Sequence, residues 1–305
     1  MNISVAVTGA SSFLGQYVVR ELLSRNILVK ALIRPKSTAA HLYDRCIGVT
    51  VIHEDMVAVD QWLPQMGQCD YFLHLGWDGV GAVGRSNMAI QEQNVGMAEQ
   101  CFLAARKIGC RSFLFSGSQA EYGPQTEVIS ETTPCHPVIP YGKGKLMVCE
   151  RLLSLANGAL MRYYHTRIFS VYGLGDHPWA LLPNCISTFC DGKVMELSSC
   201  EQYWNFMHAS DAARVLVKLL LSNAESGIYN IAGHDTRKLR DFVTEVHMLC
   251  GSGIPQYGTY VSSEPIASLQ PDISKLEKVV GHVSDASFHE KIAEMVSYYR
   301  MKGRW

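Results

Sequence analysis

Three residues of the sequence have the types and spacing needed for chemistry on a carbonyl or an alcohol. Tyr141 and Lys145 are four positions apart in a helix candidate, which places both on one face. A free tyrosine has a pKa of about 10, and a nearby ammonium stabilises the phenolate and lowers that pKa. The phenol can then act as a general acid or base near neutral pH. Ser118 follows a strand candidate, where its hydroxyl could meet the substrate oxygen, so we predict all three as catalytic residues.

A turn of small residues near the start of the chain is suited to a dinucleotide. Residues 8–15 read TGASSFLG and lie between a strand candidate and a helix candidate. In such a turn, backbone N–H groups and the positive end of the helix face a pyrophosphate. Gly9 permits the tight turn and Gly15 allows close packing of helix and strand, while Ser12 occupies the middle position where glycine is usual. The predicted cofactor contacts here are Gly9, Ser11, Ser12, Phe13, Leu14 and Gly15.

The residues at the end of the second strand candidate indicate which dinucleotide binds. Sites that prefer NAD usually place an acid there to hold the ribose hydroxyls. This chain has no acid at that point and instead carries Arg34 and Lys36, which would pair with a 2′-phosphate. We therefore favour NADP(H), with NAD(H) as the alternative. Ordinary solvated loop charges are the competing interpretation of both cations, and for Lys36 it is an equal one. Asp55, after the third strand candidate, is predicted to hydrogen-bond the adenine amino group, and a solvated loop acid is the competing interpretation.

Alternating strand and helix candidates must position these residues. Strand candidates cover residues 3–8, 27–33, 49–53, 71–75, 112–116 and 160–169, and helix candidates cover 16–25, 88–108 and 141–155. This alternation predicts an α/β fold with a doubly wound, mainly parallel sheet. The pattern becomes irregular after Tyr172, which indicates a smaller C-terminal lobe. We expect a dinucleotide-binding domain at 1–171, to which 205–233 return, and a substrate-binding lobe at 172–204 and 234–305.

Composition and charge exclude several classes of function. The 305 residues are 48% hydrophobic and 18% charged, as in an ordinary folded protein with a large core. The net charge is −1 and no block of Lys or Arg occurs, which argues against nucleic acid or an anionic membrane as a partner. No apolar run approaches the ~20 residues of a membrane helix, and no secretory leader is expected at the N-terminus. Ten cysteines without zinc-ligand spacing indicate buried thiols in a cytoplasmic protein and no metal site.

Taken together, the motifs resemble those of the extended short-chain dehydrogenase/reductases, the family of NAD-dependent epimerases and dehydratases. The likeness covers nearly the whole chain. It rests on residues 8–15, 74–77 (HLGW), Asn94, 116–123 (SGSQAEYG), 141–145 (YGKGK), 167–173 (RIFSVYG), 204–211 (WNFMHASD) and 229–233 (YNIAG). Several ordered motifs together are far more specific than any one of them.

The resemblance implies a Rossmann-type fold and hydride transfer between the nicotinamide and a substrate carbon. In that scheme Tyr141 gives or takes the hydroxyl proton, Ser118 hydrogen-bonds the oxygen, and Lys145 also holds the nicotinamide ribose. Further implied cofactor contacts are Met56, Leu75, Gly76, Trp77, Asn94, Ser116 and Phe169. The family's substrates are most often nucleotide sugars, and its members often form homodimers, which we expect here.

Departures from the family pattern narrow the expected reaction. Family dehydratases carry an Asp-Glu pair after the catalytic Ser or Thr, where this chain has Gln119 and Ala120. Residues 29–34 are similar to the dihydroflavonol 4-reductase branch, which uses NADPH. We therefore expect an NADPH-dependent reductase of a nucleotide-linked 4-keto-6-deoxy sugar. The alternatives are a nucleotide-sugar epimerase that retains NAD, an NADPH ketoreductase of a non-sugar metabolite, and a dinucleotide-sensing regulator.

The residues expected to contact the substrate differ most from the family pattern. Epimerases similar to UDP-galactose 4-epimerase place Asn at the position of Ser170 and Arg at the position of Trp204, and a late arginine clamp is missing near Leu269. Loss of such clamps weakens the grip on a diphosphate. The predicted substrate contacts are Ser118, Gln119, Ser170, His177, Trp179 and Trp204. For the tryptophans a place in the core is an equal alternative, and for His177 an ordinary loop position is the more usual one.

Overall fold

The computed structural model describes residues 3–39, 41–261 and 267–302. Its centre is a seven-stranded sheet in the order β10-β6-β5-β4-β1-β2-β3, with every neighbouring pair parallel. The strands are β1 (Ser4–Thr8), β2 (Leu28–Ile33), β3 (Val49–His53), β4 (Tyr71–His74), β5 (Ser112–Ser118), β6 (Arg162–Ile168) and β10 (Gly227–Ile231). The order reverses beside β1, as in a doubly wound sheet. The predicted fold class is therefore confirmed.

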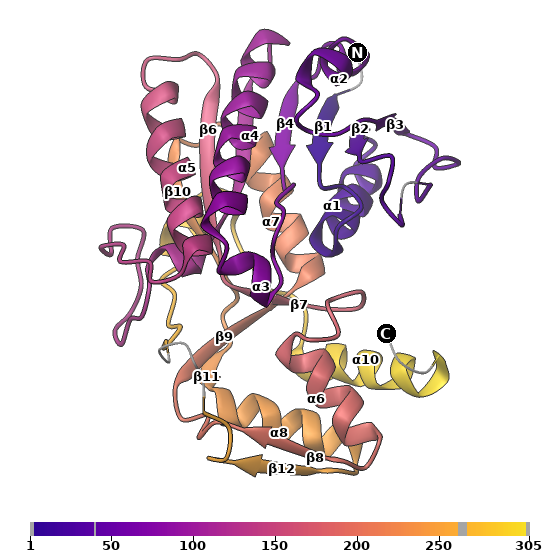
Figure 1. The fold of residues 1–305 in the computed structure, drawn as a ribbon, viewed down its shortest axis with the longest axis vertical. Helices are drawn as coiled ribbons and strands as arrows, with labels where there is room; N and C mark the ends of the chain where they lie inside the picture. The colour runs from indigo at the N-terminus through magenta and orange to yellow at the C-terminus, as the bar shows by residue number, and fades with distance from the viewer. Residues whose placement is uncertain (1–2, 40, 262–266, 303–305) are drawn as a thin grey trace.

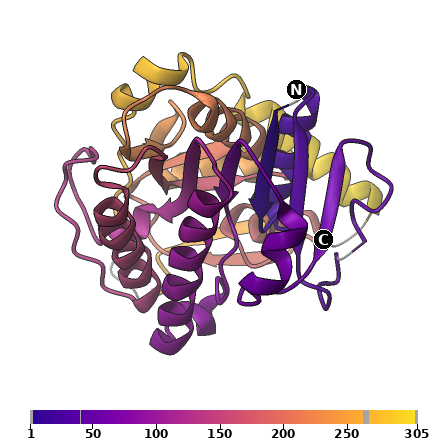
Figure 2. The ribbon, with the colours of Figure 1, turned by 90° about the horizontal axis from the view of Figure 1, so that it is seen from above.

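Helices cover both faces of this sheet (Figures 1 and 2). One face carries α1 (Phe13–Ser24), α7 (Ala209–Leu221) and α9 (Ser274–Val280), and the other carries α2 (Val59–Met66), α4 (Met88–Lys107) and α5 (Pro140–Ala156). Each face has its own apolar cluster, because strands buried on both sides present side chains to two layers of helices. Val18 and Leu22 of α1 belong to the first cluster, and Val148 and Leu152 of α5 to the second.

A smaller lobe lies beyond the carboxyl ends of the strands, where β1 and β4 point in Figure 1. It contains α6 (Leu181–Cys190), α8 (Leu239–Cys250) and α10 (Phe288–Lys302), with β8 (Val194–Leu197) paired to β12 (Ile254–Tyr257). A three-stranded sheet of β7 (Ser170–Tyr172), β9 (Tyr203–His208) and β11 (Thr236–Lys238) connects it to the main sheet. After β9 the chain returns through α7 and β10, which pairs with β6. Our division into 1–171 with 205–233 and 172–204 with 234–305 stays a proposal, and α9, within the last range, packs against α7 and β10.

Among the helices of the described residues, none combines the length and the apolar composition that crossing a membrane requires.

Candidate active site

Two adjoining cavities lie at the carboxyl edge of the main sheet, where ligands bind in doubly wound folds. The larger, of about 600 Å³, is bordered by the turn after β1 and by the ends of β2, β3 and β4. The smaller, of about 310 Å³, is bordered by the end of β5 and the first turn of α5. Both are lined by Leu75, Trp77, Val80, Tyr141 and Ile168. This shared wall makes them one continuous site.

The turn after β1 has the geometry that the glycine pattern predicts. Gly9 has φ +68°, and a Cβ there would lie 2.7 Å from the Gly76 nitrogen, so a side chain has no room. A Cβ on Gly15 would lie 2.1 Å from the Gly9 oxygen, so only glycine allows this close approach of helix and turn. The hydroxyl oxygen of Ser12 accepts a hydrogen bond from the Gly15 N–H at 3.1 Å and caps α1. The O–H of Ser12 remains a donor for a bound anion.

Residues expected at the adenosine end are only partly brought together. Arg34 lines the larger cavity, and its Nη1 lies 2.8 Å from Oδ1 of Asp78, so part of its charge is already paired. Lys36 is exposed and is not among the residues lining the cavity. The Asp55 carboxylate accepts from the Val57 N–H at 3.1 Å within its own turn, whereas Glu54 lines the cavity. Glu54 therefore lies at this end of the cavity, whereas the contact of Asp55 with the adenine stays a prediction.

The segment after β4 is fixed from behind by Asn94. Met56, Leu75, Gly76 and Trp77 line the larger cavity, as expected. Asn94 does not line it. Its Oδ1 accepts from the Asp78 N–H at 3.0 Å and its Nδ2 donates to the Asp78 carbonyl at 2.9 Å. Asn94 is buried, so it holds the loop that forms the cavity wall, and its contact with a cofactor stays a prediction.

The predicted catalytic residues converge on the smaller cavity. Ser118 is the last residue of β5, and Tyr141 and Lys145 lie on the first turns of α5. The Nζ of Lys145 donates to the Ser116 carbonyl at 2.6 Å and lies 3.7 Å from the centroid of the Trp77 ring. The hydroxyl oxygen of Ser118 accepts from the Ala120 N–H at 3.2 Å. Ser116 and Phe169 line the same cavity.

The electrostatics of the trio differ from the expectation in one respect. We expected Lys145 to lower the pKa of Tyr141, but burial raises that pKa above its ordinary value, against the opposing effects of Arg85 and of a hydrogen bond with Ser118. Lys145 is farther from the ring, with 5.7 Å between Nζ and the ring centroid. Burial lowers the pKa of Lys145 itself to about 7, with the charge of Glu121 opposing that effect. Lys145 is therefore a weaker source of positive charge near neutrality than its type suggests.

Three residues at the site were not found from the sequence. Arg85 lines the smaller cavity, and its guanidinium carbon lies 4.2 Å from the centroid of the Tyr141 ring. Glu121 is fully buried behind Ser118 and accepts from the Ser118 N–H at 2.8 Å. Gln91 is buried and accepts from the Trp77 indole N–H at 2.8 Å. No motif marks Arg85 or Gln91, while Glu121 stands within the segment SGSQAEYG, which was its one signal.

The predicted substrate contacts fall into two groups. Gln119 and Ser170 line the smaller cavity with Ser118, and His177 lines the larger one. Trp179 stacks on His177 with 4.2 Å between ring centroids, is 62% exposed and lines neither cavity. Trp204 lines neither cavity: it packs between the cluster of the first sheet face and that of the lobe. Its packing between two apolar clusters supports the core alternative, and its indole N–H has no hydrogen-bond partner among the described residues.

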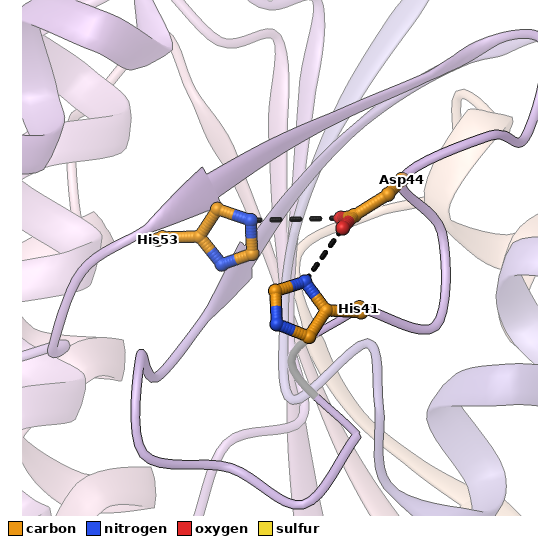
Figure 3. A group of neighbouring side chains, drawn as sticks. All are labelled: His41, Asp44 and His53. Carbon is orange, nitrogen blue, oxygen red and sulfur yellow. Dashed lines mark hydrogen bonds and ion pairs between the residues drawn. The ribbon is translucent and has the colours of Figure 1, made fainter.

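A separate polar group is formed by the loop between β2 and β3 and by His53, the last residue of β3. Figure 3 shows the imidazoles of His41 and His53 directed at the carboxylate of Asp44, with 2.6 Å from His41 Nδ1 to Oδ2 and 3.6 Å from His53 Nε2 to Oδ1. All three side chains are exposed. Since exposed ion pairs of this kind contribute little, we assign the group to surface hydrogen bonding.

Comparisons with known proteins agree with this geometry. The model of the NAD-dependent epimerase/dehydratase family matches residues 5–232. Over 259 residues, 79% of this chain and 88% of the relative, the sequence is 26% identical to the dTDP-6-deoxy-L-talose 4-dehydrogenase (NAD(+)) of Aggregatibacter actinomycetemcomitans. The structure of the UDP-N-acetylglucosamine 4-epimerase of Methanobrevibacter ruminantium superposes with a TM-score of 0.89 at 21% identity, over 99% of both chains. The UDP-glucuronic acid 4-epimerase of Bacillus cereus, solved with UDP-glucuronic acid and NAD, gives 0.85 at 21% identity, over 98% of this chain and 99% of that one.

Proposed function

Because this chain belongs to the NAD-dependent epimerase/dehydratase family, we propose that it is an NADP(H)-dependent reductase of a nucleotide-linked 4-keto-6-deoxy sugar. The observation that carries the proposal is the convergence of Ser118, Tyr141 and Lys145 on one small cavity. That cavity adjoins the larger one, which is bordered by the turn after β1. A hydride donor in the larger cavity and a carbonyl in the smaller one can therefore come into contact.

The residues of the larger cavity fit a nicotinamide dinucleotide. Gly9 and Gly15 leave a cradle that a Cβ would fill, and the N-terminus of α1 directs its backbone N–H groups there. When bound, the cofactor supplies the hydride. Tyr141 then donates its proton to the oxygen of the reduced carbonyl, and the Ser118 hydroxyl orients that oxygen. Lys145, whose Nζ is held by the Ser116 carbonyl, holds the nicotinamide ribose.

The lining of the smaller cavity supports reduction over dehydration. Loss of water from a sugar needs a carboxyl group that removes one proton and donates another. Among the described residues that line this cavity, none is Asp or Glu. Gln119 stands there, and the carboxylate of Glu121 is turned away into a buried network with His165 and Arg167. Among the described residues that line this cavity, Tyr141 is therefore the side chain that we propose as the acid for the substrate.

The nature of the substrate is supported by one of the relatives. The Aggregatibacter enzyme is named for a 4-dehydrogenase reaction on a dTDP-6-deoxy sugar, which is the reverse of the reduction proposed here. The absence of an arginine clamp at Trp204 favours, as a second substrate class, a ketone that is not linked to a diphosphate. The cavity walls contain Arg34 and Arg85 as cations for either class.

The experiment is a reductase assay with purified protein, NADPH and a dTDP-linked 4-keto-6-deoxy sugar, followed by the loss of NADPH absorbance. We expect turnover, and we expect Tyr141→Phe to reduce it by roughly 10²–10⁴-fold, the usual contribution of a general acid. Circular dichroism and thermal melting serve as the control that the Phe variant folds. Undiminished turnover in that variant overturns the assignment.

A second candidate is a nucleotide-sugar epimerase that retains NAD. The neighbour solved with UDP-glucuronic acid and NAD favours it, as does the partial pairing of Arg34 with Asp78. Mass spectrometry of the cofactor that co-purifies separates the two: retained NAD indicates the epimerase, and exchangeable NADPH the reductase. A regulator that only senses the dinucleotide would bind it and turn over no carbonyl compound. A homodimer and a cytoplasmic location remain expectations from the resemblance, to be tested by analytical ultracentrifugation and cell fractionation.

A further inference from the structure

We infer that Arg85 supplies the positive charge that stabilises the Tyr141 phenolate, and that Gln91 positions Arg85 for this task. The inference rests on the proposed role of Tyr141 as general acid and adds a residue that the trio does not contain. It makes Arg85 a positioning residue, since its guanidinium contacts the Tyr141 ring and acts on the substrate through that ring.

The first step is the geometry over the ring. Arg85 ends the short helix α3 (Ala82–Arg85), and its guanidinium carbon lies 4.2 Å from the centroid of the Tyr141 ring. This is well inside the range of a cation–π contact. Among the described residues, no carboxylate lies within ion-pair distance of Arg85. Its charge therefore faces the ring and the cavity without an anion to neutralise it.

The second step is the limited charge of Lys145. Its Nζ lies 5.7 Å from the Tyr141 centroid and is committed to the Ser116 carbonyl and the Trp77 face. Burial lowers its pKa to about 7, so a substantial fraction of the amine is neutral near neutral pH. A guanidinium stays protonated throughout the working range. Arg85 is thus the permanent cation at this phenol.

The third step is how Arg85 is held. The Nε2 of the buried Gln91 donates to the Gly84 carbonyl at 2.8 Å, at the residue before Arg85. The Oε1 of the same side chain accepts from the Trp77 indole at 2.8 Å. A Cβ on Gly84 would lie 2.3 Å from the Cα of Gly79, so α3 packs closely against the loop that precedes it. The buried Gln91 amide therefore hydrogen-bonds both to the helix that carries Arg85 and to the Trp77 ring that contacts Lys145.

The test compares wild type with Arg85→Gln and Arg85→Lys in the alcohol-oxidation direction, where the phenolate is the active form. Removing the cation raises the pKa of Tyr141, so the pH at which kcat/KM reaches half its plateau moves upward in Arg85→Gln. At neutral pH we expect about a tenfold loss of kcat/KM for each unit of that shift. Arg85→Lys restores part of the shift because it returns a charge. Arg151→Gln, which removes an exposed cation from the same helix as Tyr141, is the matched control and leaves the profile unchanged.

A second readout does not depend on turnover. Ultraviolet difference titration of tyrosinate, wild type minus Tyr141→Phe, reports the ionisation of this phenol directly. The same difference taken in the Arg85→Gln background has a midpoint at higher pH if the inference holds. An identical midpoint in both backgrounds overturns it. Failure of the proposed function is distinguishable, because the titration gives its answer even if no ketosugar is reduced.

Discussion

The buried carboxylate of Glu121 and Nε2 of His165 lie 2.9 Å apart, next to Ser118 at the end of β5. The same carboxylate accepts from Nε of Arg167 at 2.8 Å and from the Ser118 N–H at 2.8 Å. Both Glu121 and His165 are fully buried, and Arg167 is nearly so. Ser118, the proposed catalytic serine, is thus anchored to an ionic network within the core.

Replacing Glu121 tests what this network contributes to stability. Glu121→Gln leaves the buried Arg167 without its anion, and loss of one partner of a buried pair costs about 3–5 kcal/mol. We expect a fall of that size in the free energy of unfolding, measured by urea denaturation. Glu127→Gln removes an exposed carboxylate from the same loop and serves as the control. Equal stability of the two variants would contradict the network's role.

The same residue gives a pH dependence with a defined sign. Burial alone raises the pKa of Glu121, but His165, Arg167 and the Ser118 N–H outweigh burial and hold that pKa below its ordinary value. Its contribution to stability is therefore complete above the unfolded pKa of about 4.3 and is lost as the pH falls through the lower folded pKa. We expect the difference in stability between wild type and Glu121→Gln to shrink over that acid range in melts recorded at successive pH values.

Lys145 is expected to reduce stability at neutral pH, the opposite of Glu121. Its folded pKa of about 7 lies below the unfolded value of about 10.4, so the stability of the wild type rises between those two pH values. Lys145→Met, which keeps the apolar stem, removes this burial cost. We expect the variant to melt at a higher temperature at pH 6, by an amount that shrinks towards pH 10, while its reductase activity is lost. A lower melting temperature at pH 6 would show that the contacts of Nζ outweigh its burial.

Arg34 and Lys36 provide a matched pair for testing the preference for NADP(H). Both are cations after β2, but only Arg34 lines the larger cavity. Loss of a charge-assisted contact to a 2′-phosphate costs about 1.5–3 kcal/mol, or roughly 10–100-fold in affinity. We expect Arg34→Ala to raise the dissociation constant of NADPH by that factor and to leave that of NADH unchanged. Lys36→Ala should change neither, and titration calorimetry measures all four values. An equal effect of Arg34→Ala on both cofactors would favour NAD.

Gly9 provides a test of the dinucleotide cradle. Gly9→Ala combines a positive φ with a Cβ placed 2.7 Å from the Gly76 nitrogen, so either the turn or the segment after β4 must shift. Gly109→Ala has the same strain at φ +80°, with no atom within 4 Å of the added Cβ. Strain at such a position costs about 1–3 kcal/mol. We expect both variants to lose stability in thermal melts but only Gly9→Ala to lose cofactor binding as well, and retained binding in Gly9→Ala would place the cofactor elsewhere.

Local features of the chain were sufficient to predict the fold class and the family, and they led to the proposed chemistry at a carbonyl. The spacing of Tyr141 and Lys145 within one helix, and the glycines of residues 8–15, act over a few neighbouring positions. The alternation of strands and helices similarly implies a doubly wound sheet through general rules of packing and handedness. Such signals survive in the sequence because the residues that make them are close along the chain.

Tertiary structure decided the features that depend on segments distant in sequence. Arg85 meets Tyr141 because α3 folds over α5, and Arg34 is partly neutralised by Asp78 across the mouth of the cleft. For Trp204 the sequence left a substrate contact and a core position as equal alternatives, and the folded chain packs it between two apolar clusters. Burial then changes the chemistry of Lys145 itself. The types of the proposed catalytic residues follow from the sequence alone, whereas their charges depend on the exclusion of solvent and on neighbours that only the folded chain brings close.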